Sequence, residues 1–136
     1  MNTYEYLQSL VQSDWKNSSL KMCAQNFLSS LFAKQINKDV HLTYSLLGKY
    51  YACDVSTVDI TRLSQYFCGA RVPLLTMHFE YIFEDYCIDL DEENTKSAIK
   101  YNEIEVPDSG ELISDVRDHI YIYFKLSNYA VEEADI

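Results

Sequence analysis

The stretch from Thr61 to Phe83 constrains the fold of this 136-residue chain more than any other. It starts as an amphipathic segment, passes a Gly-Ala-Arg junction at residues 69–71, and continues as a nearly all-apolar segment with Pro73 near its start. Proline is tolerated in the first turn of a helix, because the N–H that it lacks would be unpaired there. We therefore predict a helix over about residues 72–88, buried on most sides at the centre of an all-α bundle.

Apolar residues recur at helical spacing in several other stretches of the chain. They predict helices over about residues 3–15, 20–35, 41–53 and 57–68, and a last strong helix that starts near Glu111 and includes Phe124. Within that last stretch, HIYIYFKL could also be a strand by its β-propensity. The acidic segment before it is predicted to be a loop with a turn at Pro107–Gly110 and one short helix near residues 94–101.

The charge of the chain limits its partners. Twenty-one acidic and eleven basic residues give a net charge of −10. Such a field repels phosphate backbones, so we predict that nucleic acid is not a partner. It would suit a basic partner segment, although solubility alone also explains it.

No sequence motif for catalysis, metal binding or membrane insertion is present. The four cysteines, Cys23, Cys53, Cys68 and Cys87, form no CxxC pair, so we expect reduced thiols, no zinc site and no cofactor. No nucleophile elbow, HExxH or phosphate loop occurs, which predicts a protein that is not an enzyme. No apolar run is long enough to span a membrane, and the N-terminus lacks the pattern of a signal peptide, so we expect an intracellular protein.

Read as helices, the segments follow an order that resembles the Bcl-2 family. In LKMCAQNF, Leu20, Ala24 and Phe27 match the leucine, the small residue and the aromatic residue of the family's third homology motif. Gln25 and Asn26 occupy the two positions at which that motif has acidic residues. The segment QYFCGARVPLLTMHFEYIF resembles the first homology region, with Gly69 at its glycine corner.

The resemblance departs from the family at its arginine, which is Leu74 in this chain. Arg71, three residues earlier, is the only nearby cation that could replace it. The short length and the absence of a C-terminal membrane anchor look more like a viral member of the family than a cellular one.

The resemblance implies one Bcl-2-like domain over residues 1–136, a helical bundle around the central helix. Its implied function is to inhibit apoptosis by sequestering the death-motif helix of pro-apoptotic proteins, such as Bim, Bak or Bax, in an apolar groove. The implied location is the host cytoplasm or the periphery of mitochondria. The groove residues that the resemblance implies are Phe27, Leu31, Leu47, Leu63, Phe67, Arg71, Val72, Leu75 and Tyr81.

Two other functions stay open from the sequence. A viral protein of the same fold could act as a decoy that binds host signalling proteins outside the groove. The chain could also be a small enzyme or an unrelated helical domain. A homodimer formed through the exposed apolar groove is also open.

Overall fold

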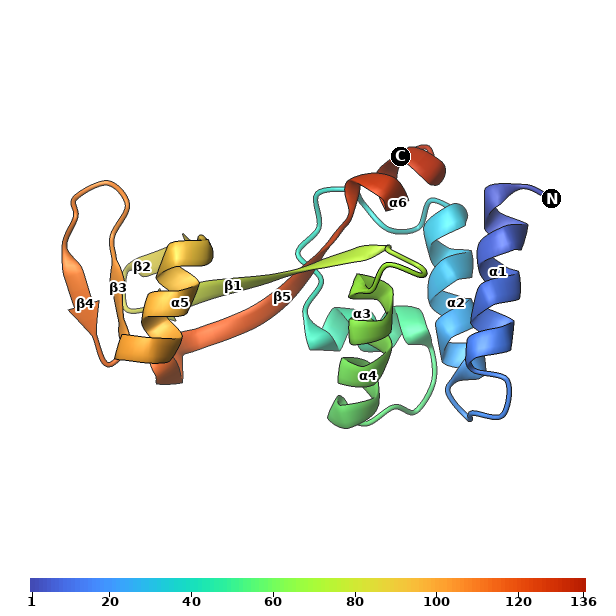
Figure 1. The fold of residues 1–136 in the computed structure, drawn as a ribbon, viewed down its shortest axis with the longest axis horizontal. Coiled ribbons are helices and arrows are strands. Elements are labelled where there is room, and N and C mark those ends of the chain that lie inside the picture. The colour runs from blue at the N-terminus through green and yellow to red at the C-terminus, as the bar shows by residue number, and fades with distance from the viewer. The chain divides into compact units, whose positions relative to one another are not determined.

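The chain has an α+β fold, so the all-α prediction is wrong. The computed structural model describes residues 1–136, which form six α-helices and five strands (Figure 1). They divide into two compact units. Unit 1 comprises residues 1–76 and 124–136, and unit 2 comprises residues 77–123.

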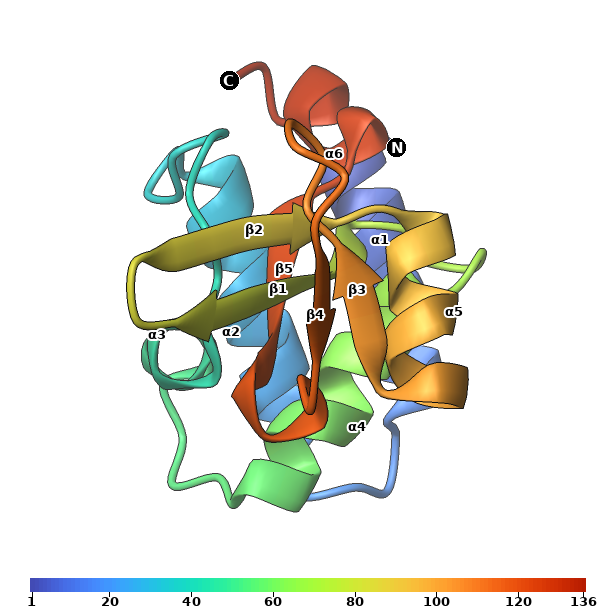
Figure 2. The same ribbon diagram turned by 90° about the vertical axis from the view of Figure 1, so that its left-hand side faces the viewer.

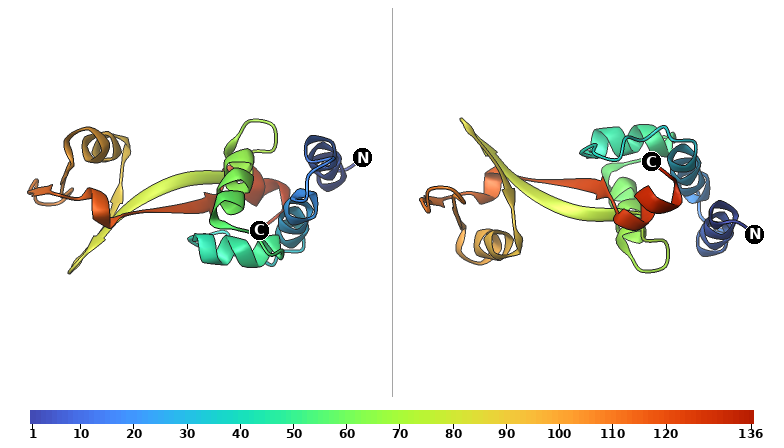
Figure 3. Two further views of the ribbon diagram at one scale, coloured as in Figure 1. Left: turned by 90° about the horizontal axis from the view of Figure 1, so that it is seen from below. Right: turned by 90° about the horizontal axis from the view of Figure 1, so that it is seen from above.

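Helices make up most of unit 1, and the predicted N-terminal helices are confirmed. They are α1 (Thr3–Asp14), α2 (Lys21–Phe32), α3 (Tyr44–Tyr51) and α4 (Thr57–Cys68), joined near the C-terminus by α6 (Asn128–Glu133). Figure 3 shows α1 and α2 side by side, and these two helices are in contact. Side-chain caps start most of these helices, because they satisfy backbone N–H groups that lack helical partners. The capping residues are Asn2, Thr43, Ser56 and Ser127.

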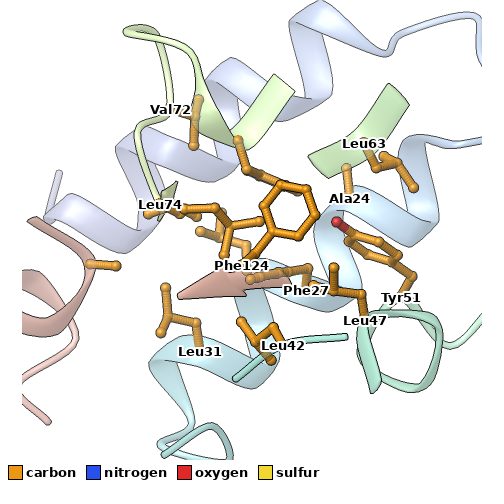
Figure 4. Close-up of a cluster of buried hydrophobic side chains, with 14 of the residues drawn as sticks. Ala24, Phe27, Leu31, Leu42, Leu47, Tyr51, Leu63, Val72, Leu74 and Phe124 are labelled. Atoms are coloured by element: carbon orange, nitrogen blue, oxygen red, sulfur yellow. The ribbon is translucent and has the colours of Figure 1, made fainter. Parts of the chain in front are cut away.

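The core of unit 1 is formed by aromatic and aliphatic side chains from the helices and from the strand ends (Figure 4). Phe27 lies at its centre, with ring centroids 5.6 Å from Tyr51 and 5.0 Å from Phe67. Phe124, which lies on the last strand of the chain, is also buried. Its backbone exchanges two hydrogen bonds with Leu42, of 2.7 and 2.9 Å, which attach the segment before α3 to that strand.

The predicted central helix over residues 72–88 is absent, because this segment is a β-hairpin. It consists of β1 (Leu75–Phe83) and β2 (Tyr86–Leu90), joined at Glu84, whose φ is 54°. Polar residues at 76, 78 and 80 alternate with apolar residues at 75, 77, 79 and 81. This period of two is typical of a strand, and the β-branched and aromatic content favours it further.

The predicted helix from Glu111 onwards is also absent. The chain forms β4 (Leu112–Ser114), a 3₁₀ turn at Arg117–His119 and then β5 (Ile120–Leu126). The strand interpretation of HIYIYFKL is the correct one, because its isoleucine and tyrosine residues fit an extended, half-buried surface.

Unit 2 holds the rest of the sheet and a small core of its own. The three-stranded sheet has the order β2-β1-β5, and Tyr81 of β1 pairs with Ile88 of β2. Helix α5 (Glu92–Tyr101) confirms the predicted short helix and leads to β3 (Glu103–Glu105), which pairs with β4. Figure 2 shows α5 beside β3. The core is formed by Tyr81, Ala98, Ile104 and Val116.

The predicted turn at Pro107–Gly110 is confirmed. Gly110 has a φ of +71°, which glycine adopts without steric cost, and its N–H donates to the Val106 carbonyl at 2.8 Å.

Candidate functional site

The apolar residues predicted to line a groove lie in the interior. Leu75 and Tyr81 are 3% and 2% exposed, and the other six, Phe27, Leu31, Leu47, Leu63, Phe67 and Val72, are 0% exposed. Seven of the eight belong to the core of unit 1, while Tyr81 belongs to the core of unit 2. These side chains therefore pack the two cores instead of lining a surface.

Arg71, the ninth predicted residue, is at the surface and takes part in a polar cluster. Its Nε donates to Oδ2 of Asp14 at 2.6 Å, and the Tyr66 hydroxyl donates to the same oxygen at 2.6 Å. Burial raises the pKa of Asp14. The hydrogen bonds from Arg71 and Tyr66 and the positive charge of Arg71 lower it by more, so the pKa of Asp14 lies below its ordinary value. The cluster ties the end of α1 to α4 and the segment that follows it.

We expect this cluster to make the stability of unit 1 depend on pH in the acidic range. A carboxyl group whose pKa is lower in the folded protein stabilises it above the unfolded pKa, which is about 3.9 for aspartate, and that contribution is lost as the pH falls below it. The urea concentration at the midpoint of unfolding should therefore depend less on pH, between about pH 2 and 5, in Asp14→Asn than in the unchanged protein. Because the Arg71 side chain is 54% exposed, the effect should be small and weakened by salt. The same reduction in pH dependence in Asp39→Asn, which removes an exposed carboxylate outside the cluster, would contradict this assignment.

A pair of helices, α3 and α4, joined by a short turn, stands out as a candidate site in unit 1. Ala52, in the left-handed conformation with φ of 53°, ends α3, and the Ser56 hydroxyl accepts from the Asp59 N–H to start α4. A Cβ added at Gly48 would lie 3.6 Å from the Ile60 side chain, so the two helices are closely packed there. A buried hydrogen bond of 2.8 Å between the hydroxyls of Tyr51 and Ser64 joins them further along.

Helix α4 has one buried face and one exposed face. Ile60, Leu63, Ser64 and Phe67 face the core. The opposite face, which we name the α4 stripe, consists of Val58, Thr61, Arg62 and Gln65. Val58 is 67% exposed, and the Arg62 side chain is 59% exposed. The stripe therefore offers a guanidinium, an amide and methyl groups along one helix. The hydroxyl of the half-buried Thr61 is engaged within the protein, with the Thr57 carbonyl at 2.9 Å and the Tyr44 hydroxyl at 3.0 Å.

Arg62 is positioned by its neighbours without being buried. Its guanidinium carbon lies 5.9 Å from the centroid of the Trp15 ring, and Nη1 lies 3.9 Å from the Asp59 carboxylate. These two interactions orient the Arg62 side chain along the stripe. Because such exposed interactions are weak, the guanidinium remains able to bind a partner.

The charge of the protein is divided very unevenly between the units. Unit 1 contains eight acidic and eight basic side chains, whereas unit 2 contains thirteen acidic and three basic ones. The whole net charge of −10 therefore belongs to unit 2. The prediction that nucleic acid is not a partner rested on the charge of the complete chain, and that reason does not apply to unit 1 by itself.

None of the four cysteines forms a disulfide, and two of the three histidines stack on aromatic rings. All four cysteines are free thiols, and burial raises the pKa of Cys23 to about 12, with a hydrogen bond to Cys53 adding to the shift. The His78 ring stacks on Tyr123 with centroids 5.3 Å apart, and the His119 ring stacks on Phe83 at 4.1 Å. No group of three or more His, Cys, Asp and Glu side chains is placed to hold a metal ion.

None of the helices combines the length and the apolar composition that crossing a membrane requires. No protein-family model, no curated protein and no solved structure matches this chain significantly.

Proposed function

We propose that unit 1 is a helix-turn-helix module that binds duplex DNA by placing the α4 stripe in the major groove. The observation that carries the proposal is the α3–turn–α4 arrangement, in which the second helix packs one face on the core and exposes a polar stripe. In helix-turn-helix proteins, the second helix lies in the major groove, and residues near its N-terminus contact the base edges. The stripe extends from Val58, the second residue of α4, through Arg62 to Gln65, the ninth.

The strands around this helix pair fit the same proposal. β1 follows α4, β5 returns to unit 1, and Phe124 of β5 pairs with Leu42 just before α3. The order α2, α3 and α4 followed by the ribbon strands β1 and β5 is the element order of a winged-helix domain, with α1 as an additional helix before it. Unit 2 would then be an elaboration inserted between the two ribbon strands.

The side chains of the stripe have the chemistry that base recognition needs. An arginine donates two hydrogen bonds to guanine, and a glutamine pairs with adenine through its amide. Arg62 and Gln65 supply these groups, while methyl groups of Val58 and Thr61 suit the thymine methyl. Because unit 1 has no net positive charge, we expect base contacts to account for most of the affinity and the dependence on salt to be shallow.

Capture of a pro-apoptotic helix stays a prediction from the family resemblance. Its eight apolar groove residues are at most 3% exposed. The geometry of the chain therefore supports DNA binding better.

The first test is selection of bound sequences from a random duplex library by the full-length protein at physiological ionic strength, which screens the repulsion between the phosphates and the acidic unit 2. We expect a short motif to be enriched over successive rounds. Failure to enrich any sequence, by protein that melts cooperatively, would contradict the proposal.

Arg62→Ala should then weaken binding to the selected duplex by about 5- to 150-fold, because one bidentate base contact contributes about 1–3 kcal/mol of discrimination. Fluorescence anisotropy with the labelled duplex measures the change. Lys34→Ala is the matched control, since it also removes an exposed cation of unit 1, one that is paired with Asp135 at 3.7 Å. Equal losses in the two variants would indicate a general charge effect and not base recognition.

A further inference from the structure

Unit 2 has an apolar cavity that the proposed DNA contact does not use. It measures about 330 Å³ and lies between the sheet and α5. Phe79, Leu90, Ala98, Ile99, Ile120 and Ile122 supply its apolar lining. Ile99 is 67% exposed and Ile122 is 40% exposed, so the cavity is open to a partner.

The one cation of the lining is already engaged within the protein. Nη2 of Arg117 donates to the Ile99 carbonyl at 2.6 Å, and its Nε donates to the Ala98 carbonyl at 3.4 Å. These carbonyls belong to the last turn of α5, where the helix dipole favours a positive charge. The guanidinium is therefore committed to the helix end and is poorly placed to receive an acidic ligand.

Acidic side chains continue the surface next to this cavity. A second hollow shares Phe79, Leu90 and Thr95 with it. Its charged lining consists of Asp91, Glu92 and Lys96. Glu92 has Lys96 as a partner at 3.2 Å, in an exposed pair of little strength. The whole of unit 2 carries thirteen acidic and three basic side chains, so its field attracts cations.

We propose that this cavity and the acidic surface beside it bind a basic amphipathic segment of another protein. An apolar side chain of the segment fills the cavity next to Ile99, and its lysine or arginine residues face Asp91 and Glu92. Charge complementarity selects this occupant. A second copy of unit 2 would bring a further net charge of −10 to this surface, and nucleic acid would bring phosphates. The acidic surface of unit 2 repels both. The inference concerns unit 2 alone and does not depend on DNA binding by unit 1.

The test uses the full-length protein and two synthetic peptides. One is an amphipathic leucine–lysine peptide of about four helical turns, and the other has every lysine replaced by glutamate. We expect the basic peptide to bind, with an affinity that falls as salt is added, and the acidic peptide not to bind. Equal binding of both peptides, or of neither, would overturn the proposal.

Two pairs of variants locate the binding site. Ile99→Gln should weaken binding of the basic peptide by at least about fivefold, since anchors in a pocket dominate such interfaces. Leu112→Gln, which changes a side chain that is 64% exposed elsewhere in unit 2, should change it less than twofold. Likewise Glu92→Gln should weaken binding more than Asp108→Asn, although each removes one negative charge. Equal effects of the two apolar substitutions would show that the peptide does not use the cavity. Equal effects of the two charge substitutions would show that it does not contact Glu92. Either outcome would overturn the site.

Sedimentation of the free protein tests the rival occupant. We expect a monomer at concentrations where the peptide binds. A dimer that Ile99→Gln dissociates would assign the cavity to a second copy and overturn the proposal.

Discussion

Phe27→Ala is expected to lower the free energy of unfolding of unit 1 by about 3–5 kcal/mol, the usual cost of removing a buried phenylalanine from a core. The Phe27 side chain is 0% exposed and packs between the rings of Tyr51 and Phe67. Truncation removes both ring contacts and leaves a cavity among three helices that are too closely packed to collapse into it. Urea unfolding followed by circular dichroism measures the change.

This prediction also separates the observed core from the predicted groove. A groove residue can be truncated with a small loss of stability, and its cost appears instead in the affinity for the ligand. Met22→Ala is the matched control on the same helix, because Met22 is 65% exposed and its truncation should change stability by no more than about 0.5 kcal/mol. Similar stabilities for the two variants would contradict the position of Phe27 in the core.

The N-terminal helices could be predicted from the sequence because their apolar residues repeat at one consistent spacing. Leu20, Ala24, Phe27 and Leu31 step along one face of α2, and all four are buried. The spacing of these residues is a local signal, and predicting α2 needed no information from distant residues.

The strands were harder to predict from the sequence, because a short, mostly apolar segment is consistent with both a buried helix and a strand. Gly69 and Pro73 fit the corner and the first turn of a helix, but glycine and proline also occur just before a strand, as they do here before β1. The alternation of Thr76, His78 and Glu80 with apolar neighbours is the pattern that distinguishes the strand from a helix, and the prediction of a helix did not take it into account. The pairing of Leu42 with Phe124 joins distant parts of the chain, and no local pattern indicates it.

One feature of the candidate sites, the uneven distribution of charge, could be predicted in part from the sequence. Thirteen of the acidic residues fall within residues 77–123, so the uneven charge could have been seen once the unit boundaries were known. Those boundaries depend on where β1 and β5 leave one core and join the other, which is a tertiary feature. The basic partner that the charge of the whole chain predicts is therefore a proposal for unit 2, because unit 1 carries no net charge.

Ile104→Ala is expected to unfold unit 2 in preference to unit 1. Ile104 is 0% exposed in a core whose other buried residues are Tyr81, Ala98 and Val116, surrounded by partly buried hydrophobic side chains. Removing a buried isoleucine costs about 2–5 kcal/mol. A core of this size supplies little stability to absorb that loss, because small units bury a small fraction of their surface.

Hydrogen exchange with mass spectrometry measures this prediction for each unit separately. Amides of β2, α5 and β3 should lose protection in the Ile104→Ala protein, whereas those of α2 and α4 should keep it, because local unfolding follows cooperative units. Ile99→Ala is the control, since it truncates an exposed isoleucine of unit 2 and should leave protection unchanged. Equal loss of protection in both units would mean that the chain unfolds as one cooperative structure. With selective loss, the Ile104→Ala protein should no longer bind the basic peptide but should still bind its selected duplex, which would assign the two activities to different units of one chain.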